Sequence, residues 1–407
     1  MTPTFKLTAV QMVGLAAVGV WIGGWVKRKV PLLDRLNIPV PVIGGLMFAF
    51  AALALRGRYV NLEADPTLRD VLQIAFMTTI GLSARVQLLR EGGWPLVKLL
   101  GIASIGAVLQ NVLGIGLATA LAIDPRLGIL SGSVALTGGP ATAIAFGGTF
   151  EKMGVAGGTA VAMASATFGI AVAGLIGGYI GGSLIRRKGL KPLPDGRGSE
   201  GVTEPRPSSR FGEQGSGDLL PIVVILGVAM GVGNLLSLGM ERLGLILPAY
   251  IGSMIVASIL RNLDDRFHFA RITQSEVDTL GRVALYLFIV MALLTLRLWE
   301  LAHLALPMLA ILLAQVALCW LMCVTMSYFV MGRDYEAAVA TAGFCGFMLG
   351  ITANAVACME ELVEKYGPAP RAFLVVPVVG AFLIDFTNSL IITTFANLRW
   401  LAHFTSR

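Results

Sequence analysis

The sequence predicts an all-α polytopic membrane protein, built from two inverted repeats that each contain five transmembrane helices plus a re-entrant hairpin. Three observations predict this fold class: an apolar composition, apolar segments long enough to cross a bilayer, and a residue pattern that recurs in the two halves of the chain. Of the 407 residues, 56% are hydrophobic and 14% are charged, against about 25% charged residues in typical soluble domains. This composition excludes an ordinary water-soluble enzyme.

The charge of the chain is basic, with 31 Lys and Arg residues, 24 Asp and Glu residues and a formal net charge of +7. Such a balance can indicate binding to nucleic acid. Here, however, the basic residues cluster between apolar segments, as they do in the cytoplasmic loops of membrane proteins. We therefore expect membrane lipid as a partner and no nucleic acid.

Ten segments approach the roughly 20 apolar residues that a membrane-spanning helix needs. They are residues 7–26, 38–55, 70–90, 95–122, 155–185, 218–238, 246–261, 277–299, 303–331 and 370–397. The distribution of lysine and arginine between these segments places both termini on the outer side of the membrane. Residues 186–217 are rich in glycine, proline, serine and charge, so we expect a cytoplasmic linker between the two halves.

Two further apolar stretches, residues 127–150 and 337–362, are interrupted by glycine, proline or polar residues. Non-helical backbone at membrane depth is tolerated only where it is buried in protein or lines a cavity. We interpret both stretches as re-entrant hairpins. The predicted organisation is an N-terminal repeat over 1–185, the linker, and a C-terminal repeat over 218–407.

An internal repeat supports this division. Residue types recur at a constant spacing of 212 residues, in the pairs Phe76 with Phe288, Arg85 with Arg297, Pro95 with Pro307 and Gly138 with Gly350. In the same register, polar Thr142 corresponds to polar Asn354. Because each half contains an odd number of crossings, the second half must be inserted upside down relative to the first. The two hairpins then enter from opposite faces and their tips meet near the midplane.

The hairpin tips are the predicted binding site, because small residues let the backbone leave the helix and point N–H and C=O groups into a cavity. Helix N-termini suit a carboxylate, and freed carbonyls suit a hard cation. The alternative is that glycine here only permits close helix packing. The candidate substrate-binding residues are Ser133, Thr137, Gly138, Gly139, Thr142, Thr352 and Asn354.

Asp385 lies in the middle of an apolar segment, where a carboxylate costs about 2.5–3.5 kcal/mol to insert. It needs a counter-ion or a proton. Asn388 lies one turn further on the same helix face, so both side chains can address one ion, and Asn388 is also a candidate substrate ligand. Thr387 and Ser389 add hydroxyls, which in spans often bond only to the carbonyl four residues earlier. The predicted cation ligands are Asp385, Asn388, Gly350 and Thr352.

Several other polar residues have two interpretations each. Gln110 and Asn111 are either functional or hydrogen-bonded glue between helices. Arg85 and Arg297 can complement an anionic substrate or extend to the membrane interface. The four cysteines, Cys319, Cys323, Cys345 and Cys358, are interpreted as small core residues with no metal cluster.

Three motifs carry a resemblance to a known family: GGPATAIA from Gly138, GFCGFMLGITANAVACM from Gly343 and YGPAPRAFLVVPVVGAFLIDFTNS from Tyr366. At these residues the chain resembles the sodium/glutamate symporter (ESS) family of bacterial inner membranes, over nearly its whole length apart from the linker. The resemblance implies ten spans in two inverted halves, re-entrant loops, a homodimer, and sodium-driven uptake of glutamate by an elevator-like movement. Both termini would then be periplasmic. One departure is that Pro140 and Ala141 follow Gly139, where the family usually has histidine and glycine.

Sodium coupling also has a physical reason, since an inside-negative potential opposes uptake of an anion by about 2.3 kcal/mol per charge per 100 mV. The alternative within transport is a sodium/proton antiporter in which Asp385 exchanges a proton for the ion. We do not expect an enzyme, because the sequence has no HExxH motif, no paired membrane aspartates and no Gly-x-Ser-x-Gly turn. A purely structural role would not need a buried acid and two broken helices.

Overall fold

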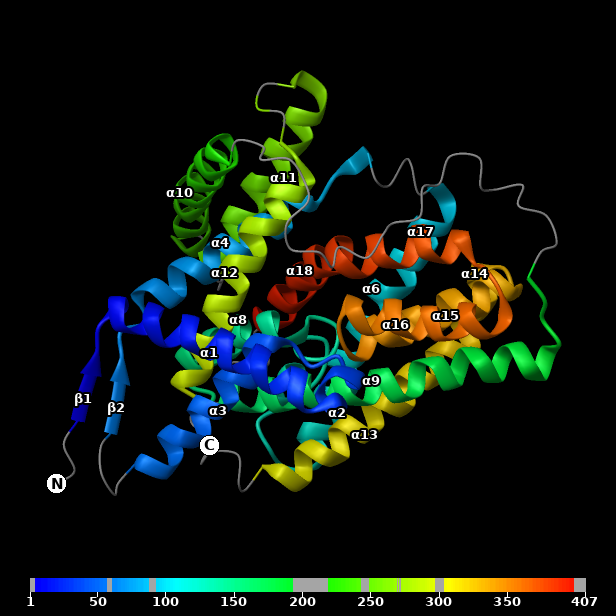
Figure 1. Ribbon diagram of the computed structural model, residues 1–407, viewed down its shortest axis with the longest axis horizontal. Helices are drawn as coiled ribbons and strands as arrows, with labels where there is room; N and C mark the ends of the chain where they lie inside the picture. Colours follow the sequence, from blue (N-terminus) through cyan, green and yellow to red (C-terminus); the bar gives the residue numbers. More distant parts are fainter. Residues whose placement is uncertain are drawn as a thin grey trace.

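The structure is a computed structural model that describes residues 4–56, 61–87, 93–192, 219–242, 249–268, 270, 272–296 and 304–398. This part of the chain is almost entirely helical (Figure 1). In the first half, the helices are α1 (Ala9–Lys29), α2 (Pro31–Arg35), α3 (Val40–Leu55), α4 (Thr67–Ser83), α6 (Gly93–Ala120), α7 (Pro125–Leu130), α8 (Gly139–Lys152) and α9 (Gly158–Lys188).

The second half repeats this order of elements. It contains α10 (Leu220–Arg242), α11 (Ala249–Phe267), α12 (Gln274–Leu294), α13 (Ala305–Met322), α14 (Tyr328–Met331), α15 (Tyr335–Leu349), α16 (Thr352–Tyr366), α17 (Pro370–Val378) and α18 (Ile384–Ala396). Two π-helical turns, Cys323–Ser327 and Val379–Leu383, join α13 to α14 and α17 to α18. Apart from the five-residue α2, the described residues of each half thus form three helices, a longer fourth, a broken pair and a long last helix.

Seven helical segments in the described ranges are long and apolar enough to cross a membrane. They are Ala9–Lys29, Gly93–Ala120, Gly158–Lys188, Leu220–Arg242, Gln274–Leu294, Ala305–Met331 and Pro370–Ala396. The other three expected spans are helices too, but α3 and α4 have 16 and 17 residues, fewer than the roughly 20 that cross a bilayer. The third, α11, has Arg261, Asp264, Asp265 and Arg266 in its last two turns. The chain is a multi-pass membrane protein.

The helices pack in two groups. The panel helices, α1, α3, α4, α10, α11 and α12, pack mainly on one another and lie on the left of Figure 1. The core helices, α6 to α9 and α13 to α18, include both broken pairs and fill the centre and right of the view. The main contacts between the groups join α8 to α12 and α18 to α4 and α11. Each group therefore takes the corresponding elements from both halves of the chain.

Packing across the halves is reciprocal. In the panel, α3 packs on α12 and α4 packs on α11, while α4 and α12 pack on each other. In the core, α6 packs on α18 and α13 packs on α9, while α6 and α13 pack on each other. By their order in the chain, α3 corresponds to α11, α4 to α12, α6 to α13 and α9 to α18. Exchanging each of these helices for its counterpart leaves this set of contacts unchanged.

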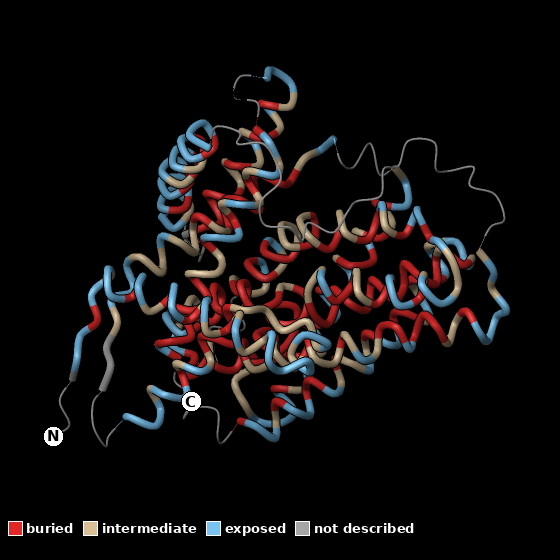
Figure 2. The backbone as a smooth tube through the Cα atoms, viewed as in Figure 1, coloured by how far each residue is buried: buried red, intermediate tan, exposed pale blue. Residues whose placement is uncertain are grey.

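Burial is greatest around the broken pairs (Figure 2). One apolar cluster is shared by the two groups, and in it the ring of Phe146 on α8 packs edge-on against Tyr250 on α11, with centroids 5.6 Å apart. The outer faces of α1 and α10 instead expose large apolar side chains, among them Trp21 and Leu235. Exposed apolar faces of this kind are typical of helices that contact lipid or another membrane protein.

One feature departs from the predicted all-α class. Strand β1 (Thr4–Leu7) pairs in parallel with β2 (Asn61–Ala64), with Thr4 opposite Asn61 and Leu7 opposite Ala64. Leu7 is buried in a cluster with residues of α1 and α12, including Met12 and Val290. The short ladder therefore holds an apolar side chain over the end of the panel.

Candidate functional site

The first helix break lies between α7 and α8. α7 ends at Leu130 and α8 begins at Gly139, and the turns between them, residues 131–138, are buried except for the half-buried Gly138. Amides on two other helices hold Ser133. Its backbone N–H donates to Asn111 Oδ1 on α6 at 3.1 Å, and its carbonyl accepts from Asn388 Nδ2 on α18 at 2.9 Å. The first break is thus tied to one helix from each half.

The second break is shorter, because only Gly350 and Ile351 separate α15 from α16. Asn354 fixes its shape from both sides. The Asn354 Oδ1 accepts the backbone N–H of Ile351 at 3.4 Å, and its Nδ2 donates to the carbonyl of Ile170 on α9 at 3.0 Å. The sequence predicts a substrate contact for Asn354, whereas these two bonds give it a role in holding the break.

The two breaks touch. Gly139 has a φ of +66°, a conformation that L side chains rarely adopt. A methyl group on Gly139 would lie 3.0 Å from Ile351 Cγ2 and 3.9 Å from the Gly350 carbonyl oxygen. Helices α8 and α16 therefore begin beside each other, and the partial positive charges of both N-termini meet at this point.

The backbone of α9 packs closely against the end of α15, directly before the second break. A methyl group on Gly169 would lie 2.2 Å from the carbonyl oxygen of Leu349, the last residue of α15. Any side chain at this position would push the two backbones apart. The end of α15 is therefore seated directly on α9.

Gln110 on α6 links the two breaks through its side chain. Its Oε1 accepts from Thr137 Oγ1 at 2.6 Å, and its Nε2 donates to the Met348 carbonyl at 2.9 Å. The backbone carbonyl of Gln110 accepts from Gln315 Nε2 on α13 at 2.7 Å. Of the two interpretations of Gln110, the structure supports hydrogen bonding between helices, and these bonds connect the two breaks of the candidate site.

Three buried polar atoms around Ser133 have no hydrogen-bond partner among the described residues. They are Asn111 Nδ2, Ser133 Oγ and Asn388 Oδ1, and all three residues have no exposed surface. One atom is a donor, one an acceptor and the hydroxyl is both. Buried polar atoms are nearly always paired, so these three indicate a place for a polar ligand, an ion or water.

Asp385 on α18 is half-buried, and among the described residues its carboxylate has no hydrogen bond or ion pair. Its neighbours Thr387 and Ser389 bond back to the carbonyls of Leu383 and Asp385 at 3.0 and 2.8 Å. The two hydroxyls therefore bond within their own helix, to carbonyls four residues earlier, and not to the Asp385 carboxylate.

Thr352, the first residue of α16, connects the second break to the last helix. Its Oγ1 donates to the carbonyl of Gly380 at 2.7 Å, and Gly380 lies in the π-helical turn Val379–Leu383. Asp385 follows five residues later, a rise of about 7.5 Å along a helix. Thr142 and Gly138, the other predicted ligands, lie at the start of α8, where Thr142 is buried.

Arg85 is not at the breaks. Its Nε donates to Asp265 Oδ2 at 2.8 Å, beside Arg261, which also pairs with Asp265. These residues line a cavity at the ends of α4 and α11. The ion pair with Asp265 gives Arg85 a role in joining α4 to α11, and Arg297 lies outside the described residues.

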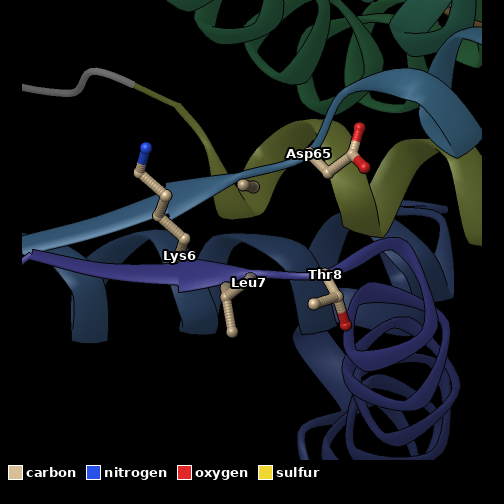
Figure 3. A pocket seen from close by; sticks show the side chains of 5 residues that line it. Lys6, Leu7, Thr8 and Asp65 are labelled. Atoms are coloured by element: carbon tan, nitrogen blue, oxygen red, sulfur yellow. The ribbon is translucent and has the colours of Figure 1, made fainter.

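A second cavity lies beside the β ladder and is lined by Lys6, Leu7, Thr8, Ala64 and Asp65 (Figure 3). Hydrogen bonds from Thr67 hold the pKa of the Asp65 carboxyl below its usual range, and the Thr67 backbone N–H donates at 2.9 Å. The ladder stands at the left end of Figure 1, away from the two breaks. This cavity is therefore separate from the candidate site.

Two broken helix pairs that meet in a multi-pass helical protein are typical of secondary transporters. The comparison with known families agrees, because the sodium/glutamate symporter family model matches residues 5–368. The chain belongs to the sodium/glutamate symporter family, as its resemblance predicts. The family implies sodium as the co-transported ion.

Relatives cover nearly the whole chain. The sodium/glutamate symporter of Escherichia coli (strain K12) is 39% identical over 400 residues, which are 97% of this chain and 98% of the relative. The sodium/glutamate symporter of Haemophilus influenzae is 35% identical over 405 residues, 98% of this chain and 100% of the relative. A solved sodium proton antiporter from Methanocaldococcus jannaschii covers 97% of the chain at 13% identity and a TM-score of 0.43. That likeness is too weak to bear on the function.

Proposed function

We propose that this protein couples the inward movement of sodium to uptake of glutamate or a related anionic amino acid across a bacterial inner membrane. One observation carries the proposal: α8 and α16 begin beside each other, and the break that precedes α8 contains Ser133, which is bonded to Asn111 and Asn388. Each of these three side chains keeps one unpaired buried atom. The names of the relatives point to the same substrate and ion.

The anionic part of the substrate belongs at the two helix N-termini. Their unpaired N–H groups and partial positive charge favour a carboxylate. Asn111 Nδ2 and the Ser133 hydroxyl supply further donors on the same side. The hydroxyls of Thr142 and Thr352 stand at the start of the same two helices, and Gly138 and Gly139 let the backbone approach. Thr137 contributes indirectly, because its hydroxyl donates to Gln110, which also bonds to the second break.

The sodium ion belongs among oxygen atoms. Asn388 Oδ1 is an unpaired acceptor, Asp385 is an unpaired carboxylate, and Thr352 Oγ1 keeps lone pairs while it donates to Gly380. Together with the Gly350 carbonyl they form a set of hard ligands. Sodium would neutralise Asp385 and draw α16 towards α18, which completes the N-terminal site for the substrate. This order of events makes substrate binding depend on sodium.

The movement that we propose follows from the two packing groups. The core helices carry both breaks and would slide along the panel helices, as in an elevator. The reciprocal contacts between the halves support an inverted repeat with one re-entrant hairpin in each half. The exposed apolar faces of α1 and α10 offer surface for lipid and for a homodimer contact.

The test is counterflow of labelled glutamate in proteoliposomes with and without sodium. Wild-type protein should exchange glutamate only when sodium is present. Asp385→Asn keeps the size of the side chain but removes its charge, so sodium-dependent exchange should fall by at least about tenfold, the effect of a lost interaction of about 1.4 kcal/mol. The control is Thr394→Val on the same helix, an exposed hydroxyl that bonds only to the Leu390 carbonyl. It should leave exchange unchanged.

The same vesicles test the alternative of sodium/proton antiport. A pH change that follows a sodium gradient in the absence of any amino acid would support antiport and overturn the proposal. Undiminished exchange by Asp385→Asn would remove Asp385 from the sodium site.

A further inference from the structure

Three of the four cysteines converge in the core, although they are far apart in the sequence. Cys319 on α13, Cys323 in the first position of the following π-helical turn, and Cys345 on α15 have sulfur atoms that all lie within 4.8 Å of one another. Each is at most 2% exposed. The expectation that these cysteines are core residues is confirmed, but the sequence did not predict that three of them lie together.

The helical geometry explains the convergence. Cys319 and Cys323 are four residues apart, so they lie on one face of α13. α15 packs against this face, where Cys323 Sγ contacts the Thr341 carbonyl at 3.9 Å and the Ser327 and Thr341 hydroxyls bond at 3.0 Å. Cys358 is not part of the group, because its Sγ donates to the Ala173 carbonyl on α9 at 3.6 Å.

The donor set determines which ligand fits. The cluster offers three sulfur atoms, and no His, Asp, Glu or further Cys of the described residues joins it. Structural zinc needs four ligands, and three thiolates around a divalent ion leave a buried net negative charge, which is costly in an apolar interior. A trivalent element with three bonds to sulfur completes its valence with the three thiols alone and carries no charge.

We propose that Cys319, Cys323 and Cys345 form a binding site for trivalent arsenic. Arsenous acid, As(OH)₃, would exchange its three As–O bonds for three As–S bonds, and each departing hydroxide would leave as water with one thiol proton. Nothing is oxidised or reduced, and no net charge or proton is released. Arsenous acid is itself small and uncharged, so it can reach a buried site without the desolvation cost of an ion.

The adduct would tie α13 and its π-helical turn to α15, the first arm of the second broken pair. Three sulfur atoms bonded to one atom at about 2.3 Å, the zinc–sulfur length, lie about 4 Å apart when the bonds are coplanar and closer when they are pyramidal. The three sulfur atoms lie within 4.8 Å of one another, so they would have to approach by about 1 Å through rotation of their side chains. The adduct would stabilise this part of the core without any group from the candidate transport site.

The experiment is arsenite binding to the full chain in detergent after its thiols have been reduced and the reductant removed. The wild type should retain about one arsenic per chain after gel filtration, as measured by elemental analysis. Single changes Cys319→Ala, Cys323→Ala and Cys345→Ala should each weaken retention by about 100-fold or more, the scale on which intramolecular attachment strengthens a further bond. Cys358→Ala is the matched control and should retain arsenic as the wild type does.

X-ray absorption at the arsenic edge of the wild type provides a measurement that no variant's folding can affect. We expect three sulfur neighbours and no oxygen neighbour. Four outcomes would each overturn the proposal. Two concern the variants: arsenic retained by all three of Cys319→Ala, Cys323→Ala and Cys345→Ala, or arsenic lost only in Cys358→Ala. The other two concern the wild type: oxygen as well as sulfur neighbours around arsenic, or retention of zinc in place of arsenite.

Discussion

The first helix break spans residues 131–138, whereas the second consists of Gly350 and Ile351 alone. The first is held from outside, by Asn111 of one half and Asn388 of the other. The second is held by Asn354 of its own helix and by α9. Three unpaired buried atoms belong to the first break and the residues that hold it, namely Asn111, Ser133 and Asn388. The comparison shows that the first break depends on contacts with two other helices, whereas the second is held by a residue of its own helix and by α9.

The largest expected effect is from removing the link between the breaks. Gln110→Leu keeps the bulk but leaves the Thr137 hydroxyl and the Met348 carbonyl without their partner. Each unpaired buried group costs about 1–3 kcal/mol, so the free energy of unfolding should fall by about 3 kcal/mol in denaturant titrations in detergent. A double-mutant cycle provides the control: Gln110→Leu should couple with Thr137→Val and be additive with Thr352→Val. Additivity in both cycles would contradict a shared link.

A smaller loss should follow from Gly169→Ala, which places a methyl group 2.2 Å from the Leu349 carbonyl. Overpacking of this kind costs about 1–3 kcal/mol, and we expect about 2 kcal/mol in the same unfolding assay. Gly116→Ala on α6 is the control, because a methyl group there has no neighbour within 4 Å. It should be neutral or stabilise the helix. Equal stability of the two variants would show that α15 is not seated on α9.

At the first break, Gly139→Ala should cost about 1–2 kcal/mol from its left-handed backbone conformation. The new methyl group would also press on Ile351 at 3.0 Å. We therefore expect a larger effect on sodium-dependent exchange than on unfolding. Gly148→Ala, on the same helix with no neighbour within 4 Å, should change neither. Normal exchange by Gly139→Ala would contradict the contact between the two breaks.

The smallest effect is expected at Thr352. Thr352→Val loses one hydrogen bond to Gly380, worth about 0.5–1.5 kcal/mol. Since the same hydroxyl is a proposed sodium ligand, the sodium concentration for half-maximal exchange should rise while the maximal rate changes little. Thr352→Ser restores the hydroxyl and should restore the sodium dependence. A valine variant with the wild-type sodium dependence would remove Thr352 from the sodium site.

Much of the fold could be predicted because it depends on local chemistry. Apolar length predicts the helices, and glycine or proline inside an apolar stretch predicts the breaks, which fall at residues 131–138 and at Gly350 and Ile351. The β ladder could not be predicted, since it pairs two four-residue segments that are separated in the sequence by α1, α2 and α3. The π-helical turns were missed as well, because their sequences, CVTMS and VGAFL, carry no signal that distinguishes them from an α-helix.

The candidate site was predictable only by residue type. Asn388 and Ser133 could be proposed separately, but the bond between them joins residues 255 positions apart. The bonds of Asn354 could not be predicted either, because the sequence does not show that the Ile170 carbonyl lies near its amide. The roles of Gln110 and the three cysteines depend in the same way on contacts between helices. The signal that could have favoured Gln110 is the adjacent Gln110–Asn111 pair inside an otherwise apolar helix.

The reciprocal packing of α3 on α12 and of α4 on α11 has a consequence for how the protein is made. The ribosome synthesises the first half before the helices of the second half exist. Until then, the surfaces of the first half that pack against those helices are exposed in the bilayer. Since these surfaces are buried only against the other half, we expect neither half to reach its folded state alone. Two separately translated fragments, one for each half, should therefore find each other in a cell and restore a working protein, while either fragment alone is degraded.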